Sequence, residues 1–122
     1  MPSSVRITII DDDEFVREAV ERLIRSLGYD AETFASAEDY LNQSSVADTQ
    51  CLITDVHMSG LTGVELQTHL IAAGHRIPII FMSGYSEDTV RATAIRNGAV
   101  GFLNKPIRVA DLIELLNKAL KP

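Results

Sequence analysis

Val5-Arg6-Ile7-Thr8-Ile9-Ile10 is an apolar stretch that runs directly into three consecutive acids, Asp11-Asp12-Asp13. The stretch predicts a buried strand, so the acids would stand where that strand reaches solvent. Carboxylates held side by side repel one another unless a cation neutralises them. This junction therefore indicates a divalent-cation site at the end of a buried strand.

Apolar runs and helical periodicities alternate along the rest of the chain. After the first strand, Val16, Val20, Leu23 and Leu27 recur at helical spacing, and Gly28 follows as a helix-ending residue. Because parallel strands need crossover connections, five such strand–helix pairs predict one parallel sheet with helices on both faces. The further strands are predicted near 30–34, 50–54, 77–82 and 100–103, and the further helices from Ser36, over 64–73, between Ser86 and Asn97, and over 111–120.

The composition fits one globular domain over residues 1–122. Hydrophobic residues make up 46% of the chain, charged residues 23%, and the formal net charge is −6, as is usual for a soluble protein. No Lys/Arg-rich stretch is present, so we expect no direct nucleic-acid binding by this segment. We also expect no membrane span, a cytoplasmic location without a signal peptide, and a buried, inert thiol at Cys51.

Polar residues follow the predicted strands at the sheet edge where ligands of parallel sheets bind. The strands end at Asp11 and Asp12, at Asp55, at Ser83 and at Lys105. Three carboxylates and one lysine suit Mg²⁺ plus phosphate, because Mg²⁺ prefers hard oxygen ligands and keeps several waters. A carboxylate can itself attack phosphorus and form an acyl phosphate when nearby cations neutralise the developing charge.

The four positions around this edge divide into separate predicted roles. Asp55 is the predicted nucleophile because it stands alone after its strand, whereas Asp11 and Asp12 can share the ion. Lys105 would pair with the phosphoryl oxygens, and the Ser83 hydroxyl would donate a hydrogen bond to one of them. Asp13 is better explained as a helix N-cap, a position that aspartate favours.

Over essentially its whole length the chain resembles the receiver domain of two-component response regulators. The resemblance rests on four stretches in order at strand ends, IIDDD at 9–13, TDVHM at 54–58, MSG at 82–84 and FLNKP at 102–106. It implies a flavodoxin-like (βα)5 three-layer sandwich with the strand order 2-1-3-4-5. It also implies that Asp55 accepts a phosphoryl group from a histidine kinase or phosphotransfer protein. Mg²⁺, or Mn²⁺, would be held by Asp11, Asp12, Asp55 and the backbone carbonyl of His57.

The same resemblance implies a switch and an output surface. Ser83 and Phe102 would form the switch, and the face of the helix before Asn97, strand 100–103 and helix 111–120 would carry the output. The chain would be a stoichiometric signalling component and no conventional enzyme. Phosphorylation would promote homodimerisation through that face, and the peptide bond from Lys105 to Pro106 would be cis. The stretch FASAEDYL at 34–41 resembles the FixJ-type subgroup, whose members usually carry a C-terminal DNA-binding domain that is not in this sequence.

Three details distinguish this sequence within that resemblance. Ser59 stands where the family commonly has proline, which predicts a less rigid loop. The rings of His57 and Tyr85 would flank the attacking water and slow hydrolysis of the acyl phosphate. Phe15 falls at the start of the first helix beside the acids, and its exposure would indicate a contact with the kinase.

Three other functions compete with the receiver hypothesis. A flavodoxin-like FMN protein would share the sheet topology, but Asp11-Asp12-Asp13 would repel the ligand's phosphate. A small metal-dependent phosphatase could use Asp11 as nucleophile and Asp13 as acid. Such enzymes usually place a small or β-branched residue and extra cap structure just after this pair, and Phe15 in a chain this short argues against it. A receiver-like binding module that is never phosphorylated is the third, and the complete set of Asp, Ser and Lys residues argues against it.

Overall fold

The computed structural model describes residues 5–43, 46–84 and 88–121. The described strands form one five-stranded parallel sheet in the order β2-β1-β3-β4-β5, which confirms the predicted topology. Ile9 of the first strand is the register partner of Ile53 in the third. The strands are β1 (Arg6–Ile10), β2 (Asp30–Phe34), β3 (Cys51–Asp55), β4 (Ile79–Ser83) and β5 (Gly101–Asn104).

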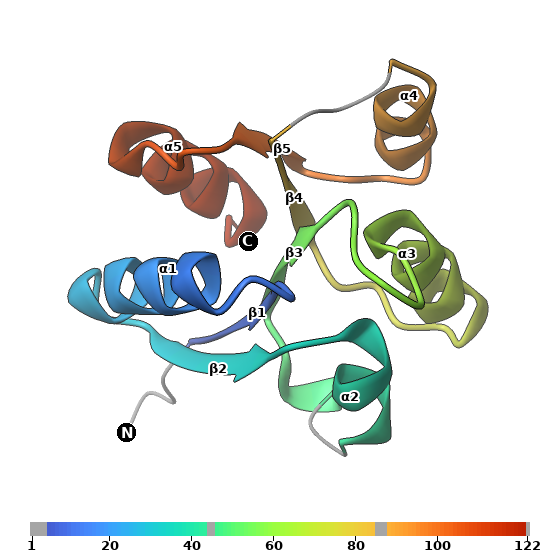
Figure 1. The fold of residues 1–122 in the computed structure, drawn as a ribbon, viewed down its shortest axis with the longest axis horizontal. Coiled ribbons are helices and arrows are strands. Elements are labelled where there is room, and N and C mark those ends of the chain that lie inside the picture. The colour runs from blue at the N-terminus through green and yellow to red at the C-terminus, as the bar shows by residue number, and fades with distance from the viewer. Residues whose placement is uncertain (1–4, 44–45, 85–87, 122) are drawn as a thin grey trace.

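Helices cover both faces of the sheet, so the described chain has three layers (Figure 1). On one face lie α1 (Glu14–Ser26) and α5 (Val109–Ala119). On the other lie α2 (Ala37–Asn42), α3 (Gly63–Ala72) and α4 (Asp88–Arg96). Among these described helices none is long and apolar enough to cross a membrane.

Two hydrophobic clusters, one on each face, hold the layers together. The first joins alternate residues of the strands, such as Ile9 and Ile53, to Val20 and Ile24 of α1 and to Leu112 of α5. The second packs the opposite strand faces against α2, α3 and α4. Successive strand residues point to opposite faces. Because helices cover both faces of the sheet, every residue of the central strands β3 and β4 is buried.

Element bounds differ from the predicted ones by one or two residues, and the start of β4 has a clear physical reason. β4 begins at Ile79 and not at Ile77, because Pro78 has no N–H to donate and contributes only its carbonyl, which accepts from Leu52 N at 2.9 Å. A 3₁₀ helix, η1 (Val46–Asp48), precedes β3 and was not predicted. The predicted cap at Ser86 lies outside the described residues.

Cys51 is buried within β3, as predicted. Burial raises the pKa of its thiol to about 12. A thiol that stays protonated at neutral pH is a poor nucleophile and a poor metal ligand. Cys51 is therefore part of the core and not of a reactive site.

Candidate functional site

The three consecutive acids take three different positions at the end of β1. Asp11 is completely buried, and its Oδ1 accepts a hydrogen bond from the Asp13 amide at 2.8 Å. Asp12 is exposed to solvent. Asp13 caps α1, because its Oδ1 accepts from the amides of Phe15 at 2.9 Å and Val16 at 3.4 Å, which confirms the predicted N-cap.

Asp55 meets these acids from the neighbouring strand. It is the last residue of β3 and its side chain is almost buried, with 7% of the residue exposed. Its Oδ1 accepts from the His57 amide at 3.1 Å. One carboxylate oxygen from each of Asp11, Asp12 and Asp55 lies within 4.8 Å of the others. Two parallel strands that end side by side thus bring together residues 44 positions apart in the sequence.

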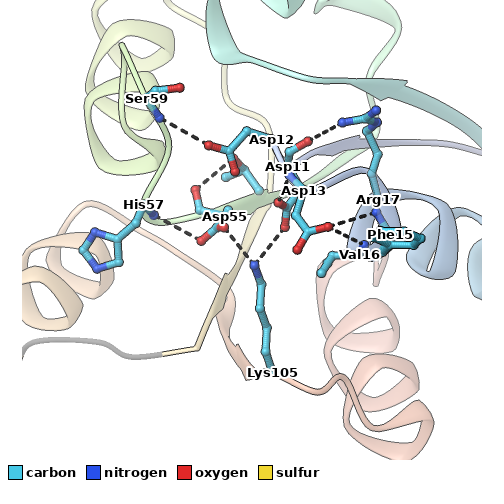
Figure 2. A network of polar contacts seen from close by, with 11 residues as sticks. Asp11, Asp12, Asp13, Phe15, Val16, Arg17, Asp55, His57, Ser59 and Lys105 are labelled. Carbon is cyan, nitrogen blue, oxygen red and sulfur yellow. Dashed lines mark hydrogen bonds and ion pairs between the residues drawn. The ribbon is translucent and has the colours of Figure 1, made fainter.

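Lys105 reaches this cluster from the loop after β5. Its Nζ donates to Asp55 Oδ2 at 2.8 Å and lies 3.0 Å from Asp11 Oδ2, so one ammonium bridges two carboxylates (Figure 2). The contact with Asp11 is an ion pair without hydrogen-bond geometry, which leaves Asp11 Oδ2 as a buried atom without a hydrogen bond. The Lys105–Pro106 peptide bond is cis, as the resemblance implied.

The pKa shifts at the cluster reflect burial competing with the ion pairs. Burial raises the pKa of Asp11 and outweighs the hydrogen bond from Asp13 and the charge of Lys105, which both lower it. For Lys105, burial alone would lower the pKa, but the hydrogen bond to Asp55 and the nearby negative charges of Asp55 and Asp11 together raise it. Lys105 therefore stays an ammonium. Burial makes the ionised form of Asp11 less favourable than it would be in water.

The donor set fits a hard divalent cation. Each of the three acids offers an oxygen, and Asp11 Oδ2 is a buried acceptor that lacks a hydrogen bond. Carboxylate oxygens, with waters completing the shell, are the ligands that Mg²⁺ selects. A cation at this place would also relieve the repulsion among Asp11, Asp12 and Asp55. The acid cluster that the sequence predicted thus has the chemistry of a metal site.

The remaining predicted residues lie around this cluster. Ser83 is the last residue of β4 and is 1% exposed, and its carbonyl accepts from the Lys105 amide at 3.0 Å. Phe102 on β5 is half-buried and stacks on Phe81, with ring centroids 5.4 Å apart. The imidazole of His57 is exposed and points away from the carboxylates (Figure 2). The hypothesis that its ring and Tyr85 flank a water stays a prediction, and Tyr85 lies outside the described residues.

Three side chains near the site were not assigned there from the sequence. Arg17 Nη1 donates to the Asp11 carbonyl at 2.7 Å. Glu38 Oε2 accepts from the Leu61 amide at 2.9 Å. The guanidinium of the exposed Arg91 lies 4.7 Å from the centre of the Phe102 ring. These contacts join separate elements, so a local sequence pattern does not predict them.

Phe15 is the most exposed large apolar side chain of the described chain, with 85% of its surface accessible. It follows the cap residue Asp13 on the first turn of α1, beside the acid cluster. Single apolar side chains are often exposed on protein surfaces, so the exposure of Phe15 does not by itself identify a contact. The exposure is the observation that the kinase-contact hypothesis required.

The chain belongs to the family of response regulator receiver domains, whose model matches residues 7–117. The response regulator protein TodT of Pseudomonas putida is 42% identical over 115 residues, which cover 94% of this chain and 51% of that protein. The transcriptional regulatory protein FixJ of Azorhizobium caulinodans is 35% identical over 120 residues, covering 98% and 57%. The chain thus spans about half the length of the curated relatives it matches.

Solved structures give the same result for the fold. The response regulator StyR superposes with a TM-score of 0.89 at 33% identity, covering 98% of this chain and 60% of that one. The crystal structure of FixJ-N has a TM-score of 0.85 at 29% identity and covers 99% and 96%. Membership in this family supports a function in two-component signal transduction. It argues against the hypotheses of an FMN protein and of a phosphatase.

Proposed function

We propose that Asp55 accepts a phosphoryl group in a Mg²⁺-dependent reaction, with a histidine kinase or phosphotransfer protein as the donor. The observation that carries this proposal is the Lys105 bridge, 2.8 Å from Asp55 and 3.0 Å from Asp11, inside a cluster of three acids. Asp55 is the acid of the cluster whose carboxylate accepts a hydrogen bond from the Lys105 ammonium. Asp11, Asp12, Asp55 and the His57 carbonyl would hold the ion, which would supply positive charge to the phosphoryl oxygens.

In the proposed reaction a carboxylate oxygen of Asp55 attacks the phosphorus. The new O–P bond forms as the bond from phosphorus to the donor's imidazole nitrogen breaks, and that nitrogen keeps the electron pair. Lys105 already contacts the Asp55 carboxylate, so its ammonium stands ready to pair with a phosphoryl oxygen. Ser83, at the end of the adjacent strand, supplies a hydroxyl for another.

Signal output would follow from these new contacts. Movement of the Ser83 hydroxyl toward the phosphoryl group would change the surroundings of Phe102, whose ring stacks on Phe81. Phe102 lies on β5, next to α4, and the proposed output face spans α4, β5 and α5. Three exposed apolar side chains on the two helices, Ile95, Val109 and Ile113, support a protein contact there. That contact would be a phosphorylation-dependent homodimer or an output domain.

The proposed partners follow from the family. A histidine kinase or phosphotransfer domain would dock beside the acid cluster, where Phe15 is exposed. Relatives that are about twice as long support an output domain beyond this segment, for which DNA binding is the proposed activity. The segment itself would act in the cytoplasm as a stoichiometric switch. Its own chemistry would be limited to forming and hydrolysing the acyl phosphate.

Incubation with Mg²⁺ and a small acyl-phosphate donor, followed by intact mass spectrometry, tests the proposal. We expect one phosphoryl adduct in the wild type, none in the presence of a chelator, and none in Asp55→Asn. Asp30→Asn is a matched control, because Asp30 is an exposed aspartate at the opposite end of the sheet. An adduct that persists in Asp55→Asn contradicts the nucleophile. Absence of any adduct in the wild type, with both small donors and kinase, favours a module that works without phosphorylation.

A further inference from the structure

Three alternate amides of the loop between β3 and α3, residues 56–62, each donate to a carboxylate. The donors and acceptors are His57 N to Asp55 Oδ1 at 3.1 Å, Ser59 N to Asp12 Oδ2 at 3.4 Å, and Leu61 N to Glu38 Oε2 at 2.9 Å. Figure 2 shows the first two of these bonds converging on the acid cluster. The loop is therefore attached to the cluster by its own backbone.

Ser59 makes one of these attachments possible. Proline, which the family commonly has at this position, has no N–H and would not donate to Asp12. The Ser59 bond is also the longest of the three, at 3.4 Å, and its acceptor belongs to the cluster that would hold a cation. An ion that engages Asp12 competes for the same carboxylate. The hydrogen bond from Ser59 to Asp12 is therefore long, and its acceptor would also serve as a ligand of the ion.

Glu38 is the acceptor outside the acid cluster. It lies on α2, it is exposed, and the amide of Leu61 lowers the pKa of its carboxyl. Because Glu38 is not a member of the metal-ligand group, its bond to the loop does not compete with an ion. Glu38 can therefore hold residues 60 and 61 while the ion at the cluster exchanges.

Gly60 lets the loop backbone lie close to Glu38. Its φ is +78°, a region that favours glycine. A Cβ at this position would lie 2.5 Å from Glu38 Oε2, so the flexible end of the Glu38 side chain would have to shift. With glycine at residue 60, the Glu38 carboxylate can accept from the Leu61 amide without this shift.

We propose that Glu38 is a positioning residue for the metal site. From α2 it holds the 56–62 loop, through the Leu61 amide, against the carboxylates of Asp12 and Asp55. Because the loop is already held in place before the ion binds, ion binding carries a smaller entropic cost of ordering the loop. The inference rests on the metal site of the proposed function.

Two substitutions of Glu38 and one control test this role. Glu38→Ala removes the acceptor, whereas Glu38→Gln keeps an oxygen at the same reach and should restore most of the effect. Asp39→Ala is the control, because it also removes an acid from the first turn of α2. The first readout is the exchange rate of the Leu61 amide hydrogen by NMR in chelator. The second is the Mg²⁺ dissociation constant by calorimetry.

We expect Glu38→Ala to speed Leu61 exchange and to weaken Mg²⁺ binding, each by about fivefold, the scale of one hydrogen bond at a surface. Asp39→Ala should change neither. Unchanged Leu61 exchange in Glu38→Ala would overturn the loop contact. Faster exchange with unchanged Mg²⁺ affinity would overturn the positioning role and leave a structural contact. If the wild type binds no Mg²⁺, the proposed metal site fails and the positioning role fails with it, whereas Leu61 exchange still judges the loop contact.

Discussion

The layer of Ile9 and Ile53 and the layer of Asp11 and Asp55 are adjacent levels of the same two strands. Ile9 and Ile53 are register partners and are completely buried. Two residues further along each strand, on the same face, Asp11 is equally buried and Asp55 nearly so. One level is apolar and belongs to the core, whereas the next is made of carboxylates that share one lysine.

Burial at the end of these strands positions charged groups and does not add apolar packing. At the isoleucine level, burial removes apolar surface from water and stabilises the fold. At the aspartate level, burial raises the pKa of Asp11 and opposes its ionisation. The two levels should therefore respond in opposite directions when the buried side chain is replaced.

Ile53→Ala should have the largest effect on stability. The substitution leaves a cavity in the centre of the sheet, and we expect the free energy of unfolding to fall by about 2–5 kcal/mol. Urea denaturation followed by circular dichroism measures it. A loss well under 1 kcal/mol would show that the isoleucine level is not the stabilising one.

Asp11→Asn should stabilise the protein in the presence of a chelator. It removes a buried charge that repels Asp55, while Lys105 keeps its bond to Asp55. We expect a gain of roughly 1 kcal/mol in the free energy of unfolding at pH 7. Asp13→Ala is the control of opposite sign, because loss of this N-cap should destabilise α1 by about 1 kcal/mol.

The gain from Asp11→Asn should depend on pH. Asp11 ionises near its ordinary pKa of 3.8 in the unfolded chain, and burial raises that pKa in the fold. The folded state then binds the proton more tightly, so the penalty is absent below pH 3.8 and complete above the raised pKa. Urea melts of both proteins across the acid range should converge as the pH falls. A constant difference at every pH would contradict the assignment to Asp11 ionisation.

Arg91→Met should have the smallest effect. Phe102 is neither fully buried like Ile53 nor charged, and the Arg91 guanidinium lies over its ring at 4.7 Å. We expect an exposed cation–π contact to contribute about 0.5–1 kcal/mol. A double-mutant cycle with Phe102→Leu separates this coupling from any other effect of replacing Arg91. Fully additive effects would show that the ring and the guanidinium are not coupled.

Much of the fold was predictable because its signals are local. The bounds of β2 match the predicted 30–34, and Asp13 caps α1 as its position beside an apolar run indicated. The strand ends then place Asp11, Asp55 and Lys105 at one edge, because parallel strands share a direction. The family resemblance added the strand order and the cis peptide bond, both of which the structure shows.

Contacts between distant elements were not predictable from the sequence. The sequence predicted only that Glu38 lies near the start of a short helix. In the structure its carboxylate accepts from an amide 23 residues away. The hydrogen bond from Ser59 to Asp12 spans 47 residues. The sequence shows that residue 59 has a backbone N–H, which proline would lack, but it does not show which carboxylate accepts from it. Periodicity specifies which face of an element is buried. It does not specify which loop amide a surface carboxylate meets.

The central claim is that Asp55, and not Asp11 or Asp12, receives the phosphoryl group. Reduction of the phosphorylated protein with borohydride converts an acyl phosphate of aspartate to homoserine, which tandem mass spectrometry of the peptides locates. The account predicts homoserine at position 55 alone, and only when Mg²⁺ was present during phosphorylation. Homoserine at position 11 or 12, or at a position outside the acid cluster, would contradict it.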